Sequence, residues 1–128
     1  MVTAECSSAK LRRALPNLNI LDQSNQLESY ARSTLPSSTS AVCVACPASL
    51  EEVRQLVVAA NQLKIALYPI SRGRNWGYGD ACPVGSGQVI VDLGKMNRIV
   101  EVNTTLGYAV VEPGVTFGQL AQHLADIN

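Results

Sequence analysis

The sequence has 128 residues, of which 47% are hydrophobic and 16% charged, a composition typical of a folded domain or of part of a larger one. Ten Lys and Arg residues balance ten Asp and Glu residues, which argues against a nucleic acid or an anionic membrane as partner. No apolar run approaches the roughly 18 residues of a membrane span, and the first residues lack the apolar core of a secretory signal. We therefore expect a cytoplasmic protein, although the basic N-terminal stretch leaves an organelle transit peptide open.

The first predicted element is a short helix over residues 24–35 (SNQLESYARSTL), capped by Ser24 and ending before Pro36. Residues 41–47 (AVCVACP) then predict a buried strand that carries a Cys-x-x-Cys motif. Such a motif is compatible with a redox pair or half of a zinc site. Its spacing on a strand points Cys43 and Cys46 to opposite faces, and no second Cys or His pair completes a metal site. We interpret both as core residues in a reducing compartment and expect no metal.

A helix is predicted over residues 49–63, beginning with a capping box in which the Ser49 hydroxyl and the Glu52 carboxylate each accept from a free N–H group. Its apolar positions recur at helical spacing and predict the face that packs on a sheet: Leu50, Val53, Leu56, Val57, Ala60 and Leu63. Residues 65–70 (IALYPI) predict a second strand. Strand, helix and strand with short connections form a βαβ unit, so the two strands are expected to be parallel.

The remaining predicted elements are three strands and a final helix. Residues 88–93 predict a third strand, and residues 98–103 and 108–112 predict a hairpin joined by the turn TTLG. Thr116 and Gln119 form a second capping box at the start of the last helix. Because this arrangement leaves a sheet edge unpaired, it indicates the opening portion of a larger α+β domain.

The most informative segment is glycine-rich and covers residues 69–87 (PISRGRNWGYGDACPVGSG), directly after the second predicted strand. Ligands of open α/β sheets often bind at such strand ends. The segment matches neither the Walker A pattern nor the dinucleotide pattern GxGxxG, which has Cys82 at its third glycine position. Glycines let backbone amides converge on phosphate oxygens, and the nearby arginines add cationic donors. The same composition also suits an ordinary surface loop, and composition alone does not separate the two.

Three motifs in succession carry a resemblance: GRNWGYGDACP, QVIVDLGKMNRIVEVN and YAVVEPGVTFGQL. They are similar to the FAD-binding domain of the vanillyl-alcohol oxidase and 4-cresol dehydrogenase family, over residues 41–128. The resemblance implies an α+β fold, namely the incomplete first subdomain of a PCMH-type FAD-binding fold, in which a βαβ unit precedes antiparallel strands and a helix. Residues 1–40 are then expected to form an N-terminal segment with a short helix.

The resemblance implies that FAD is the cofactor. It assigns the FAD pyrophosphate to the loop after the second strand and brings the EPGVT segment close to the flavin. The implied cofactor-binding residues are Ile70, Ser71, Arg72, Gly73, Arg74, Asn75, Gly79, Pro113, Gly114 and Val115. Neither His nor Cys occurs at positions 72–75, so a covalent link to FAD would have to come from a residue outside this chain.

Tyr78 is the implied catalytic residue. In the phenol-oxidising branch of the family, the tyrosine of the GYG motif faces the substrate. Its hydroxyl would stabilise the phenolate that forms before hydride leaves the benzylic carbon. The alternative is a loop tyrosine whose ring packs on Trp76 or on the sheet. The remaining ionisable candidates, Asp80, Asp92 and His123, are expected to have structural or surface roles.

The implied function is that of an FAD-dependent oxidoreductase acting on a small-molecule substrate, a para-substituted phenol or a related alcohol, as part of a longer chain. The second FAD subdomain and the substrate domain would lie outside these 128 residues. Two alternatives stay open from the sequence. One is a truncated, non-catalytic module, and the other is an FAD oxidoreductase for a sugar lactone or a 2-hydroxy acid.

Overall fold

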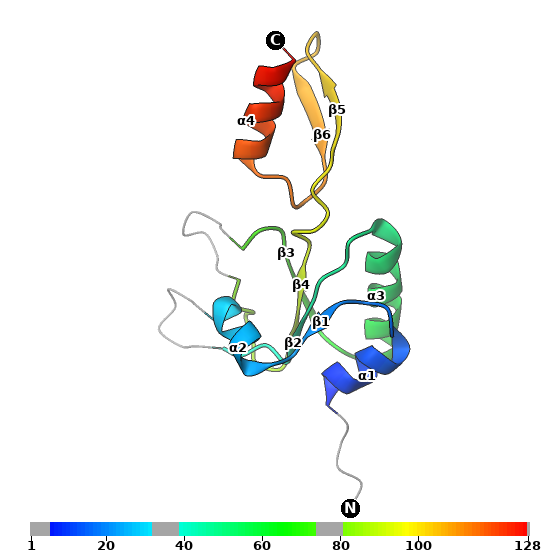
Figure 1. Ribbon diagram of the computed structural model, residues 1–128. Helices are drawn as coiled ribbons and strands as arrows, with labels where there is room; N and C mark the ends of the chain where they lie inside the picture. Colours follow the sequence, from blue (N-terminus) through cyan, green and yellow to red (C-terminus); the bar gives the residue numbers. More distant parts are fainter. Residues whose placement is uncertain (1–5, 32–38, 74–80, 128) are drawn as a thin grey trace, which may run out of the picture.

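The computed structural model describes residues 6–31, 39–73 and 81–127 (Figure 1). Helices and strands alternate in the first part of this chain, and a strand pair with a helix follows. The elements are α1 (Ser7–Ala14), β1 (Ile20–Leu21), α2 (Ser24–Leu27), the 3-10 helix η1 (Glu28–Tyr30), β2 (Cys43–Ala45), α3 (Leu50–Leu63), β3 (Leu67–Ile70), β4 (Val89–Asp92), β5 (Ile99–Asn103), β6 (Tyr108–Val111) and α4 (Phe117–Asp126). The α+β class expected from the sequence is confirmed.

The first four strands form one sheet in the order β1-β2-β4-β3. Strand β4 is parallel to both β2 and β3, whereas the short β1 pairs antiparallel with β2. The prediction that β2 and β3 are parallel is therefore confirmed, but the two strands are not neighbours. The apolar β4, whose residues Val89, Ile90 and Val91 are all buried, occupies the centre between them. A strand covered on both faces has this continuous apolar sequence.

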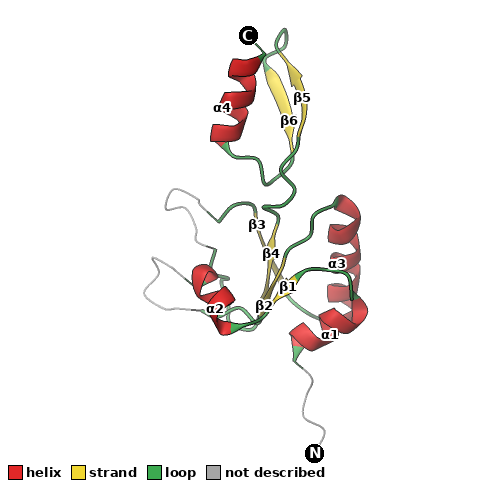
Figure 2. Ribbon diagram, viewed as in Figure 1, coloured by secondary structure: helices red, strands yellow, loops and turns green. Residues whose placement is uncertain are grey.

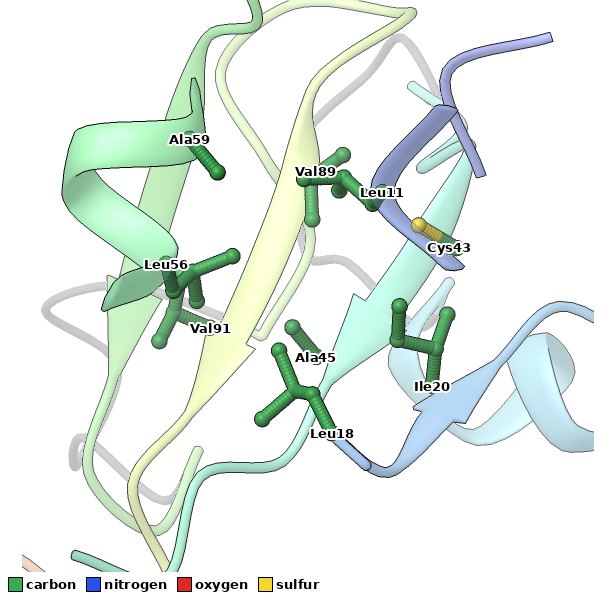
Figure 3. Close-up of a cluster of buried hydrophobic side chains, with 9 residues drawn as sticks. All are labelled: Leu11, Leu18, Ile20, Cys43, Ala45, Leu56, Ala59, Val89 and Val91. Carbon is green, nitrogen blue, oxygen red and sulfur yellow. The ribbon is translucent and has the colours of Figure 1, made fainter. Parts of the chain in front are cut away.

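Helices cover both faces of this sheet (Figure 2). On one face, Leu11 of α1 and Leu56 of α3 pack with Cys43 and Val89 in a fully buried cluster (Figure 3). On the other face, Cys46, Val44 and Ile90 pack with side chains of α2 and η1. The two cysteines are buried on opposite faces and unbonded, as predicted from their spacing. Burial raises the pKa of Cys43 to about 12, so its thiol is neutral at physiological pH.

The hairpin and the final helix lie beyond one end of the four-stranded sheet (Figure 1). Strands β5 and β6 pair antiparallel, with a bulge between Ile99 and Glu101. Helix α4 begins with the predicted capping box, because Thr116 Oγ1 accepts from the Gln119 N–H at 3.1 Å and Gln119 Oε1 accepts from the Thr116 N–H at 2.9 Å. No residue of α4 is buried in this structure.

Several predicted details are wrong. The helix predicted from Ser24 is only one turn, it is capped by Gln23, and it tightens into η1. The Glu52 carboxylate accepts from the Ala48 N–H at 2.7 Å, not from the Ser49 N–H, so only the Ser49 half of that capping box forms. Helix α1 and strand β1 were not predicted, because eight and two residues are too short for a clear period. Among the described residues, no helix is long and apolar enough to cross a membrane.

Candidate cofactor site

An open hollow of about 360 Å³ lies at the carboxyl ends of the three parallel strands. Each strand contributes a residue at or just beyond its end: Cys46 follows β2, Arg72 follows β3, and Asp92 ends β4. The other polar residues of the lining are Lys95 from the turn after β4, Tyr30 from η1, and Asn19, which precedes β1. Because the carboxyl ends of parallel strands meet at one sheet edge, residues far apart in sequence gather there, and this is where α/β sheets commonly bind ligands.

Of the predicted loop residues that the structure describes, Arg72 lines this hollow. Ile70 is buried at the end of the strand, and its carbonyl accepts from the Leu93 N–H at 3.0 Å. Ser71 and Arg72 are exposed, and Arg72 Nη1 donates to the Gly94 carbonyl at 3.4 Å. Gly73 has a φ of +62°, and a Cβ there would lie 3.2 Å from the Ala81 Cβ, so this position requires glycine. The other predicted loop residues lie outside the described part of the chain: Arg74, Asn75, Tyr78 and Gly79.

The second predicted segment, Pro113 to Val115, lies against the turn that follows β4. The Gly114 N–H donates to the Met96 carbonyl at 2.7 Å. A Cβ on Gly114 would lie within 2.7–2.8 Å of three carbonyl oxygens, those of Leu93, Gly94 and Met96. Arg72 contacts the same turn through the Gly94 carbonyl. Residues 93–96 therefore join the two segments that the family resemblance assigned to the cofactor.

Asp92 fixes the start of this turn. Its Oδ1 accepts from the Gly94 N–H at 2.8 Å, and its Oδ2 accepts from the Tyr30 hydroxyl at 2.7 Å. Burial and the neighbouring Asp92 carboxylate raise the pKa of Tyr30 well above its ordinary value, so the hydroxyl stays a donor at neutral pH. A side chain at Gly94 would disturb this arrangement, since a Cβ there would lie 2.9 Å from Asp92 Oδ1 and force the carboxylate to shift.

The donor set of this hollow fits an anionic diphosphate such as that of FAD. The guanidinium of Arg72 and the ammonium group of Lys95 bring positive charge to the strand ends. Gly94, which lines the hollow, adds no side chain to the wall formed by the turn. No group of three or more His, Cys, Asp or Glu residues suited to a metal ion occurs within residues 6–31, 39–73 and 81–127.

Residues 41–128 match the FAD binding domain family, and the chain belongs to this family of flavoprotein oxidoreductase domains. This confirms the resemblance to the vanillyl-alcohol oxidase and 4-cresol dehydrogenase family. Over 122 residues, or 93% of this chain, the sequence is 41% identical to the flavoprotein subunit of 4-cresol dehydrogenase (hydroxylating) from Pseudomonas putida. A structure of p-cresol methylhydroxylase with bound substrate superposes with a TM-score of 0.86 and 40% identity over 94% of this chain. A D-2-hydroxyglutarate dehydrogenase from Stutzerimonas stutzeri is 34% identical over 84% of it.

The chain spans only a fraction of these proteins. The matches cover 23% of both the 4-cresol dehydrogenase subunit and the D-2-hydroxyglutarate dehydrogenase, and 24% of the p-cresol methylhydroxylase chain. The family relation thus concerns part of an FAD-binding fold.

Four polar residues of the hollow were not predicted to bind the cofactor: Asn19, Tyr30, Asp92 and Lys95. Asp92 was assigned only a structural role, and Lys95 no role at all. Asp92 and Lys95 could have been found by applying to β4 the rule that was applied to β3, because residues 92–95 (DLGK) lie at the end of a buried parallel strand and include a glycine. Tyr30 had no comparable signal, since it lies 62 positions from its partner Asp92.

Proposed function

We propose that this chain is the FAD-binding part of a flavin-dependent oxidoreductase that oxidises a para-substituted phenol or a related alcohol. The observation that carries the proposal is the turn 93–96, where the Arg72 side chain and the Gly114 backbone meet at the carboxyl ends of the parallel strands. The phenolic substrate class is supported by the similarity to the 4-cresol dehydrogenase subunit. The chain works, in this proposal, within a longer polypeptide.

The residues of this chain bind and orient the cofactor. Backbone amides of residues 70–75 and the Arg72 guanidinium hold the pyrophosphate, and residues Pro113 to Val115 border the isoalloxazine side. Tyr78 donates a hydrogen bond to the phenolic oxygen of the substrate and stabilises its anion. Acceptance of a hydride from the benzylic carbon is the chemistry that FAD supplies when it is bound.

The cofactor assignment is tested by expressing the complete protein and recording its absorption spectrum. A yellow protein that binds FAD is expected, and a colourless protein indifferent to added FAD would overturn the proposal. Arg72→Ala should weaken FAD binding by about tenfold or more, because a charge-assisted hydrogen bond is lost. Arg54→Ala is the matched control, since Arg54 is an exposed arginine on α3 that pairs with Glu51 at 2.7 Å, away from the hollow. It should leave the affinity unchanged.

A second substrate class is favoured by one specific observation, the similarity to a D-2-hydroxyglutarate dehydrogenase. In that case the flavin remains and the substrate is a 2-hydroxy acid. Tyr78→Phe in the complete protein separates the two classes. For a phenol oxidase, turnover of a para-alkylphenol should fall by about a hundredfold or more, the loss typical of one oxyanion donor. Unchanged phenol binding and turnover would show that Tyr78 does not have the proposed role.

A further inference from the structure

The Tyr30–Asp92 pair connects the N-terminal part of the chain to the candidate cofactor site. Tyr30 belongs to η1, which lies before the segment that matches the FAD binding domain family. Its hydroxyl nevertheless donates to Asp92 Oδ2 at 2.7 Å, at the carboxyl end of β4. The contact is partly buried, so water competes with it less than with a surface hydrogen bond.

Asp92, held by Tyr30, also binds the turn that follows β4. Its second oxygen, Oδ1, accepts from the Gly94 N–H at 2.8 Å, and the Met96 N–H closes the turn on the Leu93 carbonyl at 3.0 Å. Both oxygens of one carboxylate are thus used, one toward η1 and one toward the turn. A carboxylate held from two sides has little rotational freedom left, and the peptide group that it binds is fixed with it.

The turn 93–96 then sets the positions of the groups proposed to hold FAD. The Gly94 carbonyl accepts from Arg72, and the Met96 carbonyl accepts from the Gly114 N–H. Gly114 is closely packed here, because its backbone lies directly against the carbonyls of the turn. A small shift of the turn would therefore move both cofactor-binding segments together.

We propose that Tyr30 and Asp92 are positioning residues for the cofactor site, which hold the turn 93–96 so that Arg72 and Gly114 are correctly placed to bind FAD. Neither side chain needs to contact the cofactor for this role. The inference rests on the proposed function, and it assigns to the N-terminal segment a direct influence on cofactor affinity.

The decisive variant is Tyr30→Phe, which removes one hydroxyl and keeps the ring. The matched control is Tyr108→Phe, because the Tyr108 hydroxyl donates to the Glu101 carboxylate at 2.6 Å, between the two strands of the hairpin. Both variants lose a tyrosine–carboxylate hydrogen bond of nearly equal length. They are made in the complete protein, stripped of flavin and titrated with FAD under conditions where melting curves show every variant to be folded.

We expect Tyr30→Phe to weaken FAD binding by about five- to twentyfold, the range for losing a hydrogen bond to a charged group. Tyr108→Phe should stay within about twofold of the wild type. In the flavin-free protein, the Gly94 amide should exchange with solvent faster in Tyr30→Phe than in the control. Asp92→Asn keeps an acceptor for this amide and should retain more affinity than Asp92→Ala.

Two outcomes would overturn the inference in different ways. If wild-type protein binds FAD and Tyr30→Phe binds it equally well, with only a lower melting temperature, the pair merely stabilises the fold and the proposed function stands. If the wild-type protein does not bind FAD at all, the proposed function fails and the positioning role fails with it. Tyr30→Phe keeps the test decisive even if the Asp92 variants do not fold.

Discussion

At the scale of single residues, Gly114 connects the four-stranded sheet to the hairpin and α4. A Cβ at this position would lie 2.7–2.8 Å from three main-chain carbonyl oxygens, and carbonyls cannot rotate aside as a flexible side chain does. Gly114 is also buried, so no displacement toward solvent relieves the contact. The glycine of the VEPGVT motif is thus required by packing, in addition to any approach by the cofactor.

The first prediction concerns Gly114→Ala. The added methyl group forces the turn 93–96 away from residues 113–115, and overpacking of this kind costs about 1–3 kcal/mol of unfolding free energy. Gly118→Ala is the control, because Gly118 lies in α4 and its nearest contact would be 3.9 Å away. Alanine favours helix over glycine by up to about 1 kcal/mol, so this variant should be neutral or stabilised. Urea unfolding of both variants measures the difference, and equal midpoints would contradict the prediction.

The second prediction concerns Cys43, whose thiol has its pKa raised by burial to about 12. In the unfolded chain the thiol ionises near its ordinary pKa of about 8.5, so the unfolded state releases its proton first as the pH rises. The stability linked to this neutral thiol is complete below that value and is lost as the pH increases toward 12.

Cys43→Ala removes the titrating group and isolates its effect. The unfolding free energy of the wild type minus that of the variant should decrease between about pH 9 and pH 11, by up to about 1.4 kcal/mol per pH unit. The cavity left by the substitution costs the same at every pH and does not affect the slope. Unfolding by urea at several pH values gives both curves. Parallel curves would mean that the Cys43 thiol does not titrate as its burial requires.

At the scale of elements, α3 shows what the periodicity of a sequence can and cannot predict. Its bounds, Leu50–Leu63, agree within one residue with the predicted helix 49–63. The predicted apolar face was only partly right. Leu56 and Ala60 are buried as expected, but Leu50 and Val57 are 77% and 51% exposed. Apolar residues at both Leu56 and Val57 satisfy helical spacing for two overlapping stripes, and only the position of α1 and the sheet decides between them.

The third prediction follows from this choice of face. Leu56→Ala should destabilise the fold by about 2–5 kcal/mol, because it opens a cavity beside Leu11 and Val89 in the buried cluster. Val57→Ala, one position further along the same helix, should change the unfolding free energy by only about 0.5 kcal/mol. Thermal or urea unfolding of the two variants compares the faces directly. A larger loss for Val57→Ala would mean that α3 packs through the other stripe.

The sequence was sufficient for elements with a local signal and insufficient for long-range pairings. Thr116 with Gln119 correctly marked the start of α4, because a capping box is formed by neighbours in sequence. The insertion of β4 between β2 and β3 depends on long-range pairs, such as Cys43 with Val89 and Leu67 with Val89, and no local pattern specifies it. The same reason hid the Tyr30–Asp92 contact. Arg72, which was expected at the end of β3 to bind the cofactor, lies in the lining of the hollow, and its role there stays a prediction.

At the scale of the whole molecule, the described residues divide into a well-covered sheet and a sparsely covered hairpin with α4. The sheet is packed on both faces by helices. In contrast, all four residues of β6 are exposed, and Phe117 at the start of α4 is 88% exposed. The candidate hollow is likewise open, with lining residues from the sheet edge and η1. We propose that these surfaces are completed by further parts of a longer polypeptide, together with the rest of the FAD site.

The last prediction is that the isolated 128-residue chain binds FAD at least about a hundredfold more weakly than the complete protein, a difference of about 2.8 kcal/mol. The reason is that this chain spans only 23% of the 4-cresol dehydrogenase subunit and offers one open wall of the proposed site. Quenching of flavin fluorescence during titration gives both affinities, and circular dichroism confirms that the isolated chain is folded. Arg72→Ala in the isolated chain should abolish even the weak binding. Equal affinity of the two proteins would mean that these residues alone build the cofactor site.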